Sequence, residues 1–223
     1  MLDTSNTDSV ADELIRRVEQ EGVVPVFSMP EAQLSGFQLR FPGVVPTAVA
    51  FRVIQYSAKE ELLISAPFLE EHAVLLYADL VRRLARNRVF VRCLTREYDT
   101  NLQVQKAARR LSDIYLSWGD PSRIQFREYH VQLGDVTASL PSVDDRFHYE
   151  SVHAKIMISD SSLCYVGSAE LRMNSLYANF EAGFILAGAL VRTFREAFYH
   201  IWKSAKPITI QGASKAAPAV RDP

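Results

Sequence analysis

Apolar runs of strand length alternate with segments of helical periodicity through the middle of the chain, and this alternation constrains the fold most. Residues 62–65, 89–94 and 124–128 are the apolar runs, whereas 70–86 and 100–117 have apolar residues at helical spacing. Strands that consist of continuous apolar residues are usually buried on both faces. We therefore expect an α/β sandwich with a mixed central sheet and helices on both of its faces.

The other segments predict elements of the same kind. Residues 9–20 predict a surface helix that begins at Ser9, and 25–47, with four prolines, predict an irregular connection. Helices are expected around 47–59 and over 189–204, and strands over 163–166 and 180–186; 131–150 predict a loop or loose hairpin. We expect three parts: an N-terminal helix and extension (1–47), one domain (48–205) and a disordered tail (206–223).

Composition is that of a globular domain. The chain of 223 residues is 48% hydrophobic and 23% charged, and it has no run of about 18 uncharged apolar residues. The first residues, MLDTSNTDSVADE, are acidic and polar, unlike a secretion signal. We expect a cytoplasmic protein with no membrane association. Cys93 and Cys164 lie in strand-like runs, so buried free thiols are expected rather than a disulfide.

Charge is spread unevenly along the chain. The net charge is −1, but residues 80–130 contain 11 Lys/Arg and 5 Asp/Glu. This segment could be a footprint for a polyanion such as nucleic acid, centred on Arg82, Arg83 and Arg86. An ordinary solvated helix face explains the same pattern. The further basic residues are Arg88, Arg92, Arg96, Lys106, Arg109 and Arg110.

The stretch HAKIMISD places an imidazole and an ammonium on one face of a predicted strand. Val152, Ala154, Ile156 and Ile158 alternate with His153, Lys155 and Met157. A solvent-exposed strand face explains this pattern, and so does an anion site. Residues 159–162 favour a turn, so we expect a hairpin that places His153 opposite Ser168; a loop with an odd number of residues would break this register. Gly167 would allow close backbone approach beside Ser168.

His153, Lys155, Asp160, Gly167 and Ser168 also stand at the spacings of the signature of the phospholipase D superfamily, which the chain resembles. The resemblance extends loosely over residues 48–204 and implies a phospholipase D-like α/β sandwich. It also implies that Glu181 holds the catalytic histidine. Asp160 is expected to be structural, because an aspartate in a turn accepts hydrogen bonds from backbone N–H groups.

The resemblance implies a covalent mechanism without a metal or another cofactor. One histidine attacks phosphorus, a second protonates the leaving oxygen, and Lys155 and Ser168 hold the other phosphate oxygens. The chain has one His-X-Lys unit, so the second His153 is expected from another chain of a homodimer. His72, His130 and His200 have no metal-ligand spacing.

Glu170 departs from the family pattern, which often has Asn two residues after the motif serine. A carboxylate repels an anion by roughly 4 kcal/mol at about 4 Å and an effective dielectric near 20, whereas an amide can donate a hydrogen bond. The side chain could be protonated, turned away, or paired with Lys155 or Arg172.

The resemblance and the basic segment together predict a phosphodiesterase, and a nuclease above all. Small single-motif members of the superfamily are often nucleases, some of them in bacterial phage defence. Two alternatives remain: a hydrolase of phospholipids or small phosphodiesters, and a nucleic-acid-binding or scaffold protein whose site is impaired by Glu170.

Overall fold

The computed structural model describes residues 7–132 and 149–210. The N-terminal third contains α1 (Thr7–Glu21), β1 (Val23–Ser28), α2 (Glu31–Arg40), β2 (Val45–Pro46), α3 (Thr47–Ser57) and β3 (Glu61–Ser65). The middle contains α4 (Glu71–Leu76), α5 (Ala78–Arg86), β4 (Phe90–Thr95), α6 (Leu102–Leu116), the short 3-10 helix η2 (Pro121–Arg123), β5 (Ile124–Glu128) and β6 (His130–Gln132). After the gap follow β7 (Tyr149–Ser151), β8 (Lys155–Ser159), β9 (Leu163–Gly167), α7 (Met173–Tyr177), β10 (Glu181–Ala187), α8 (Ala189–Ser204) and β11 (Lys206–Ile208).

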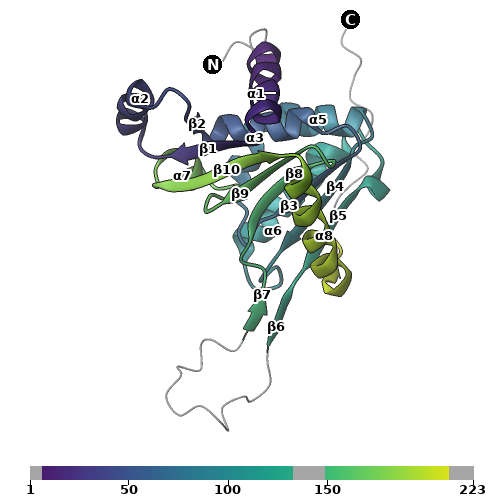
Figure 1. Ribbon diagram of the computed structural model, residues 1–223. Helices are drawn as coiled ribbons and strands as arrows, with labels where there is room; N and C mark the ends of the chain where they lie inside the picture. The colour runs from purple at the N-terminus through teal and green to yellow at the C-terminus, as the bar shows by residue number, and fades with distance from the viewer. Residues whose placement is uncertain (1–6, 133–148, 211–223) are drawn as a thin grey trace, which may run out of the picture.

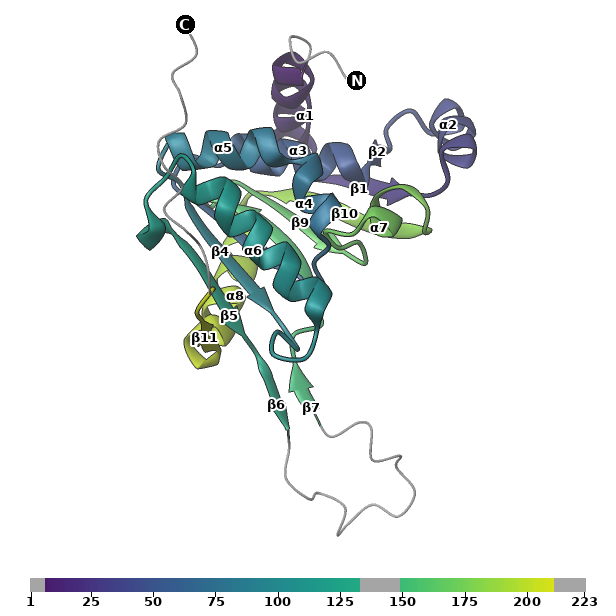
Figure 2. The same ribbon diagram turned by 180° about the vertical axis from the view of Figure 1, so that it is seen from behind.

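A mixed sheet of nine strands forms the centre of the molecule. Its order is β11-β5-β4-β3-β8-β9-β10-β1-β2. β3, β4 and β5 are parallel to one another, whereas β8, β9 and β10 are antiparallel to their neighbours. Helix α8 covers one face, and α3, α5 and α6 lie on the other, as Figures 1 and 2 show from opposite sides. The predicted α/β sandwich with a mixed sheet and helices on both faces is confirmed.

Successive residues of β3 show why its three central residues are all apolar. Leu62 and Ile64 belong to the larger core beneath α3, α5 and α6, and Leu63 belongs to a second core with Phe198 and Trp202 of α8. Side chains of a strand alternate between faces, so a strand covered on both sides has no position for a solvated residue.

The N-terminal segment 25–47 differs from the irregular connection that we expected. It contains most of β1, all of α2 and β2, and the start of α3. β1 pairs with β10 over six residues, from Val23 opposite Leu186 to Ser28 opposite Glu181. Pro25 lies inside this strand, where the proline content led us to expect no regular structure. Pairing with β10 and burial of Val24 and Val26 outweigh the lost N–H of Pro25.

Two further expectations are corrected, and two are confirmed. Residues 206–208, which we placed in a disordered tail, form β11 against β5. The helix expected over 70–86 is two helices, α4 and α5, divided at Tyr77. β6 and β7 pair as the base of a hairpin, as expected, with residues 133–148 outside the described residues. Both cysteines are buried free thiols. No helix in the described ranges is long and apolar enough to cross a membrane.

Candidate active site

The hairpin of β8 and β9 has a register one residue away from the predicted one. Its turn consists of three residues, 160–162, so Lys155 lies opposite Gly167 and Ser159 opposite Leu163. The expected pairing of His153 with Ser168 was therefore wrong, because the loop has an odd number of residues. β8 begins only at Lys155, and His153 precedes it as an exposed residue.

Asp160 binds the backbone at the far end of β8. It adopts a φ of 53°, and its carboxylate accepts hydrogen bonds from the backbone N–H groups of residues 59, 60 and 61 at 3.0, 2.9 and 2.8 Å. Five residues separate it from Lys155, about 16 Å along a strand. Its contacts are those of a structural carboxylate that joins the hairpin turn to the start of β3.

Lys155 is the centre of the polar cluster at the other end of β8. Its Nζ lies 3.2 Å from Glu170 Oε1 and 3.4 Å from His153 Nε2, and it donates to the carbonyl oxygen of His153 at 3.0 Å. An ammonium can only donate, so a hydrogen bond between these two groups uses the lone pair of Nε2, in the tautomer that carries its proton on Nδ1. The ammonium therefore contacts both the imidazole of the motif histidine and the carboxylate that departs from the family pattern.

Glu170 is buried and faces Lys155, one of the arrangements that the sequence left open. The two side chains are 8% and 13% exposed, so water screens their attraction weakly. Glu170 Oε2 also accepts a hydrogen bond from the backbone N–H of Phe68 at 2.9 Å. This carboxylate thus connects the segment after β3 to the segment after β9.

Ser168 is held by Glu181 on the neighbouring strand. The hydroxyl donates to Glu181 Oε2 at 2.6 Å and accepts from the backbone N–H of Ala182 at 3.1 Å. Asn179 donates to the other oxygen of Glu181 at 3.2 Å. Sequence reasoning paired Glu181 with the ring of His153; in the structure Glu181 contacts Ser168 and Asn179 instead.

Gly167 allows the approach of β10 to this hydroxyl. A Cβ atom at Gly167 would lie 2.7 Å from the carbonyl oxygen of Ala182 and from Cα of Gly183, and would overlap the hydroxyl oxygen of Tyr165. A side chain would therefore push β9 away from β10 beside Ser168.

Two arginines beside the cluster were not assigned to the site from the sequence. The guanidinium of Arg96 lies 4.6 Å from the ring centroid of Phe68, and that of Arg172 lies 5.8 Å from it. Phe68 is the residue whose N–H binds Glu170. Arg96 directly follows β4, and ligand-binding residues commonly follow the carboxyl ends of parallel strands, so its position contained a usable signal.

An apolar cavity of about 270 Å³ adjoins His153 on the α8 side of the sheet. Its walls include Leu94, Val152, Ile156, Phe198 and Ile201. It lies beside the imidazole and has the apolar lining typical of sites for small apolar groups.

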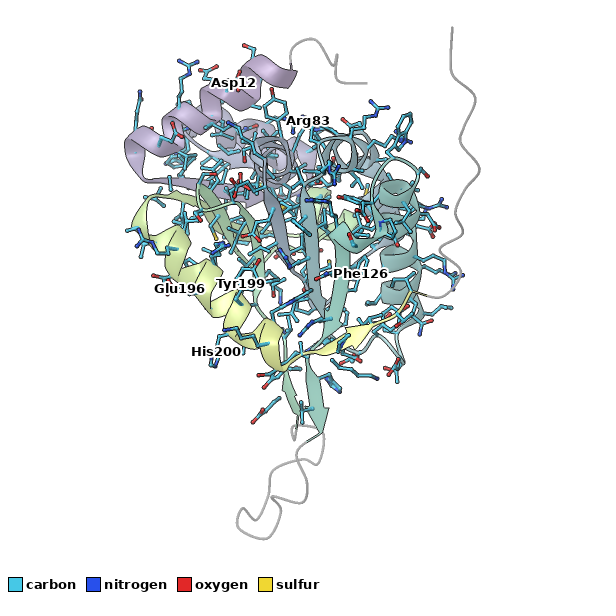
Figure 3. The ribbon with its side chains drawn as sticks, turned by 90° about the vertical axis from the view of Figure 1, so that its right-hand side faces the viewer. Asp12, Arg83, Phe126, Glu196, Tyr199 and His200 are labelled. Carbon is cyan, nitrogen blue, oxygen red and sulfur yellow. The ribbon has the colours of Figure 1, made fainter. Side chains whose placement is uncertain are left out.

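The predicted nucleic-acid-binding residues Arg82, Arg83 and Arg86 lie elsewhere. They belong to α5, at the end of the molecule opposite the β6–β7 hairpin, where Figure 3 labels Arg83. Arg83 donates to the carbonyl oxygen of Tyr56 at 2.5 Å, and Arg86 stacks over Trp118. Two of the three guanidiniums therefore already make contacts within the protein.

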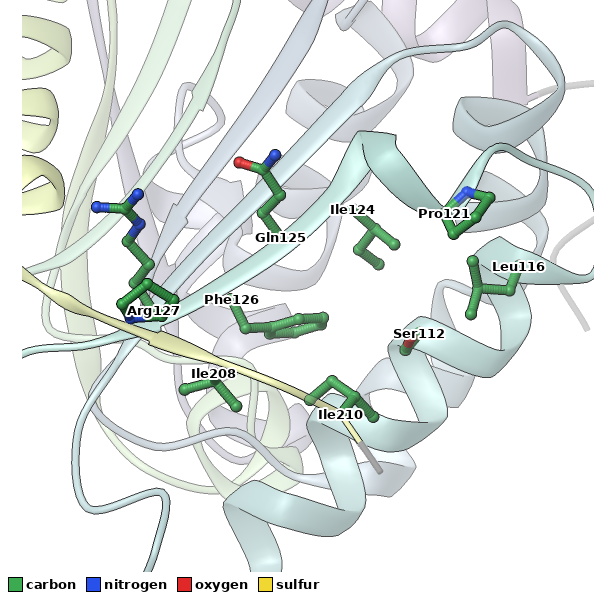
Figure 4. A pocket seen from close by; sticks show the side chains of 10 residues that line it. Ser112, Leu116, Pro121, Ile124, Gln125, Phe126, Arg127, Ile208 and Ile210 are labelled. Carbon is green, nitrogen blue, oxygen red and sulfur yellow. The ribbon is translucent and has the colours of Figure 1, made fainter. Parts of the chain in front are cut away.

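A separate pocket of about 410 Å³ lies between α6, β5 and β11 (Figure 4). Its walls are mainly apolar side chains such as Phe126, Ile208 and Ile210, with Arg127 at one side. It contains none of the motif residues. In the described part of the chain, no group of three or more His, Cys, Asp or Glu side chains is arranged to hold a metal ion.

The sheet order and the site define the phospholipase D class of fold, and comparison with solved structures supports this. A phospholipase D family member, Nuc of Salmonella typhimurium, has a TM-score of 0.55 at 16% identity and covers 83% of this chain and 97% of its own. NucT of Helicobacter pylori has a TM-score of 0.55 at 13% identity, with coverage of 83% and 99%. The phosphatidylserine synthase of Haemophilus influenzae Rd KW20 has a TM-score of 0.56 at 12% identity, with coverage of 83% and 40%.

Sequence comparison shows the family. Residues 53–202 match the model of the cardiolipin synthase PLD-like domain, so the chain belongs to this family within the phospholipase D superfamily. The cardiolipin synthase of Clostridium perfringens (strain 13 / Type A) is 34% identical over 65 residues. That match covers 29% of this chain and 14% of the relative, so it spans about a seventh of the relative's length.

Proposed function

We propose that this protein is a phosphodiesterase that forms a covalent phosphohistidine on His153. The observation that carries the proposal is the cluster at the ends of β8 and β9. His153 Nε2 lies 3.4 Å from the ammonium of Lys155, and the hydroxyl of Ser168 is oriented by Glu181. An imidazole with a free lone pair is a competent nucleophile near neutral pH, and the ammonium and hydroxyl can bind phosphate oxygens.

In the proposed reaction, His153 Nε2 forms a bond to phosphorus while the bond to the leaving oxygen breaks. The leaving oxygen takes a proton from a second imidazole, and water then cleaves the P–N bond and regenerates His153. Lys155 must turn from Nε2 toward the phosphate for the attack. No step needs a metal, and we propose a metal-independent reaction that persists in excess EDTA.

The direct test is the rate on an activated phosphodiester such as bis(p-nitrophenyl) phosphate, with and without EDTA. His153→Ala should lower the rate by at least the roughly 10²- to 10⁴-fold expected for a positioned acid or base. His200→Ala is the matched control, because His200 is exposed on the outer side of α8. Full activity of His153→Ala, or abolition by EDTA with rescue by one divalent ion, would refute the proposed mechanism.

We further propose that the second imidazole is His153 of another copy, which makes the active protein a homodimer with one shared site. Mixed dimers of wild-type and His153→Ala chains test this. If each reaction needs both imidazoles, activity falls as the square of the wild-type fraction; independent sites give a linear fall. His130, whose strand position is opposite Ser151, is the histidine of the same chain to replace in parallel. A linear fall together with loss of activity in His130→Ala would assign the acid role within one chain.

Nucleic acid is the substrate class that we propose, because Arg96 and Arg172 flank the cluster and guanidiniums bind phosphodiester backbones well. We propose further that Arg82, Arg83 and Arg86 bind more distant phosphates. Replacement of each set of arginines in turn, followed by measurement of affinity against salt, tests which set contacts phosphates. Each phosphate contact that is lost should flatten the slope of log affinity against log salt by about 0.9 on duplex DNA. A phage-defence role belongs to this proposal, and plaque counts on cells with and without the protein would test it.

A phospholipid is the second candidate substrate, and the apolar cavity beside His153 favours it. Relatives named cardiolipin synthase and phosphatidylserine synthase are consistent with it. Labelled single- and double-stranded DNA, RNA, and phospholipid vesicles should be assayed side by side. Ile156→Glu would introduce a charge into the cavity wall: a selective loss on vesicles supports the lipid, and unchanged vesicle activity excludes the cavity as its binding site. Binding without turnover of any substrate would favour an impaired binding protein.

A further inference from the structure

A cavity of about 600 Å³ that is lined mostly by charged side chains lies at the opposite end of the sheet from His153. It is located where β3 and β4 begin, beside α8. We call its cationic side chains the basic cradle: Lys59, Arg88, Arg92, Arg123 and Arg195. Glu61, which begins β3, and Lys155, which begins the antiparallel β8, are at opposite ends of adjacent strands. The distance along the strands is about 13 Å or more, so the cradle is separate from the active site.

Glu61 fixes two of the five cations in position. Arg92 lies 2.9 Å from one carboxylate oxygen and Arg195 lies 2.6 Å from the other. The hydroxyl of Tyr199, which Figure 3 labels on α8, also donates to Glu61. Glu61 is buried, so the positions of these guanidiniums are set before any ligand arrives.

The other three cations have no described carboxylate partner in an ion pair. Lys59 and Arg88 are exposed, and Arg123 donates to the carbonyl oxygen of Arg88 at 2.7 Å. Arg123 and Arg92 also lie 4.3 and 4.9 Å from the ring centroid of Phe90, so both guanidiniums contact one ring.

Nearby carboxylates offset this cluster only in part. Glu60 and Glu61 are the two acidic residues that line the cavity, against five cations. Outside the lining, Asp120 lies near Arg123 and Arg88, and Asp160 lies near Arg195, so counting these two carboxylates as well leaves one positive charge. Like charges that are held close together without an anion raise the free energy of the folded protein, and a bound anion would reverse this effect.

We propose that the basic cradle is a binding site for clustered phosphate groups. Arginine forks recognise phosphate oxygens in pairs, and the cavity has the size of sites for small ligands. The rings of Phe90 and Tyr199 are covered by guanidiniums, so the phosphates, rather than a stacked base, supply the recognition. The phosphates can come from a free polyphosphate or from a nucleic acid strand. The site does not depend on His153 or on the proposed reaction.

Calorimetric titration of the full chain with inorganic tripolyphosphate, and separately with a single-stranded oligonucleotide, tests the proposal. The key variant is Lys59→Gln with Arg88→Gln, because both side chains are exposed and without described partners. Arg16→Gln with Arg40→Gln is the control, since it removes the same charge from exposed positions on α1 and α2. The key variant should bind about tenfold or more weakly, and the control should bind like the wild type. His153→Ala should bind normally, which separates this result from failure of the proposed reaction.

Arg123→Lys gives an independent comparison. It keeps the charge but removes the fork, so binding should weaken while the folded protein persists. If tripolyphosphate binding depends on Lys59 and Arg88, the result supports a free polyphosphate as the ligand of the basic cradle. If only oligonucleotide binding depends on these two residues, the ligand is a nucleic acid strand. Equal affinity of the key variant and the control for both probes, or no binding of either probe to the wild type, would overturn the proposal.

Discussion

Replacement of Glu170 by Asn should raise the proposed phosphodiesterase activity, and the geometry gives its size. A carboxylate about 4 Å from a phosphate oxygen repels it by roughly 4 kcal/mol at an effective dielectric near 20, and Lys155 attracts it by a similar amount. The two terms nearly cancel in the wild type because Lys155 is 3.2 Å from Glu170. Removal of the Glu170 charge leaves the attraction between Lys155 and the phosphate. Water that enters the site weakens this attraction, so we expect a gain of about 10- to 100-fold in kcat/KM, mainly through a lower KM.

The same change should cost stability. Removing one partner of a buried ion pair typically costs about 3–5 kcal/mol, and the N–H of Phe68 also loses its acceptor. Glu170→Gln separates these effects, because it removes the charge and keeps an oxygen for Phe68; Glu170→Asp keeps the charge and should not gain activity. Rates on one activated phosphodiester, with unfolding measured in urea, decide the matter. A folded Asn variant that is no faster than wild type would refute the electrostatic reasoning.

Three further predictions concern residues that shape the fold around the site. Asp160→Ala should lower the free energy of unfolding by about 2–4 kcal/mol, because three backbone N–H groups lose a charged acceptor. Asp160→Asn should lower it by less, because asparagine tolerates the positive φ of this position. Urea melts that show equal losses for the two variants would contradict this. Gly167→Ala should lower both stability and rate, since its Cβ would contact β10 beside Ser168, and a variant that matches the wild type in both would show that the strands adapt. Burial raises the pKa of the Cys93 and Cys164 thiols to about 12 from 9.0, so both thiols should resist a thiol reagent at pH 8 until the protein unfolds. The contribution of these thiols to the free energy of unfolding is present below pH 9 and is lost as the pH rises toward 12. Thermal melts across that pH range would detect this loss.

The central strands could be predicted because burial on both faces leaves a plain signal in the sequence. Leu62, Leu63 and Ile64 are apolar in succession, since each faces one of two cores. β1 and β11 could not be predicted in the same way. Both contain proline, and they are stabilised by pairing with β10 and β5, partners that are remote in the sequence. Tertiary pairing therefore outweighed local propensity at both places.

The hairpin that carries the candidate site could be predicted, but the contacts of its side chains could not. Motif spacing singled out His153, Lys155 and Ser168, and the turn residues predicted the hairpin. The three-residue turn shifted the register, because Asp160 adopts a positive φ and binds the start of β3, a contact across about 100 residues of sequence. The same shift places Gly167, rather than Val166, opposite Lys155, and Ser168 is hydrogen-bonded to Glu181.

Charges within the site show why its rim matters for anion binding. The inner cluster contains one ammonium, that of Lys155, and two carboxylates, those of Glu170 and Glu181, so it does not attract a phosphodiester by its charge. Arg96 and Arg172 add two guanidiniums beside Phe68, and Glu97, 3.6 Å from Arg96, offsets one of them, so the attraction at the rim depends chiefly on Arg172. Substrate would thus meet the arginines first and compete with Glu170 for Lys155 only after it is bound. On this account, long-range attraction depends on the rim and is sensitive to salt, whereas the chemical step depends on how readily the buried Lys155–Glu170 pair opens.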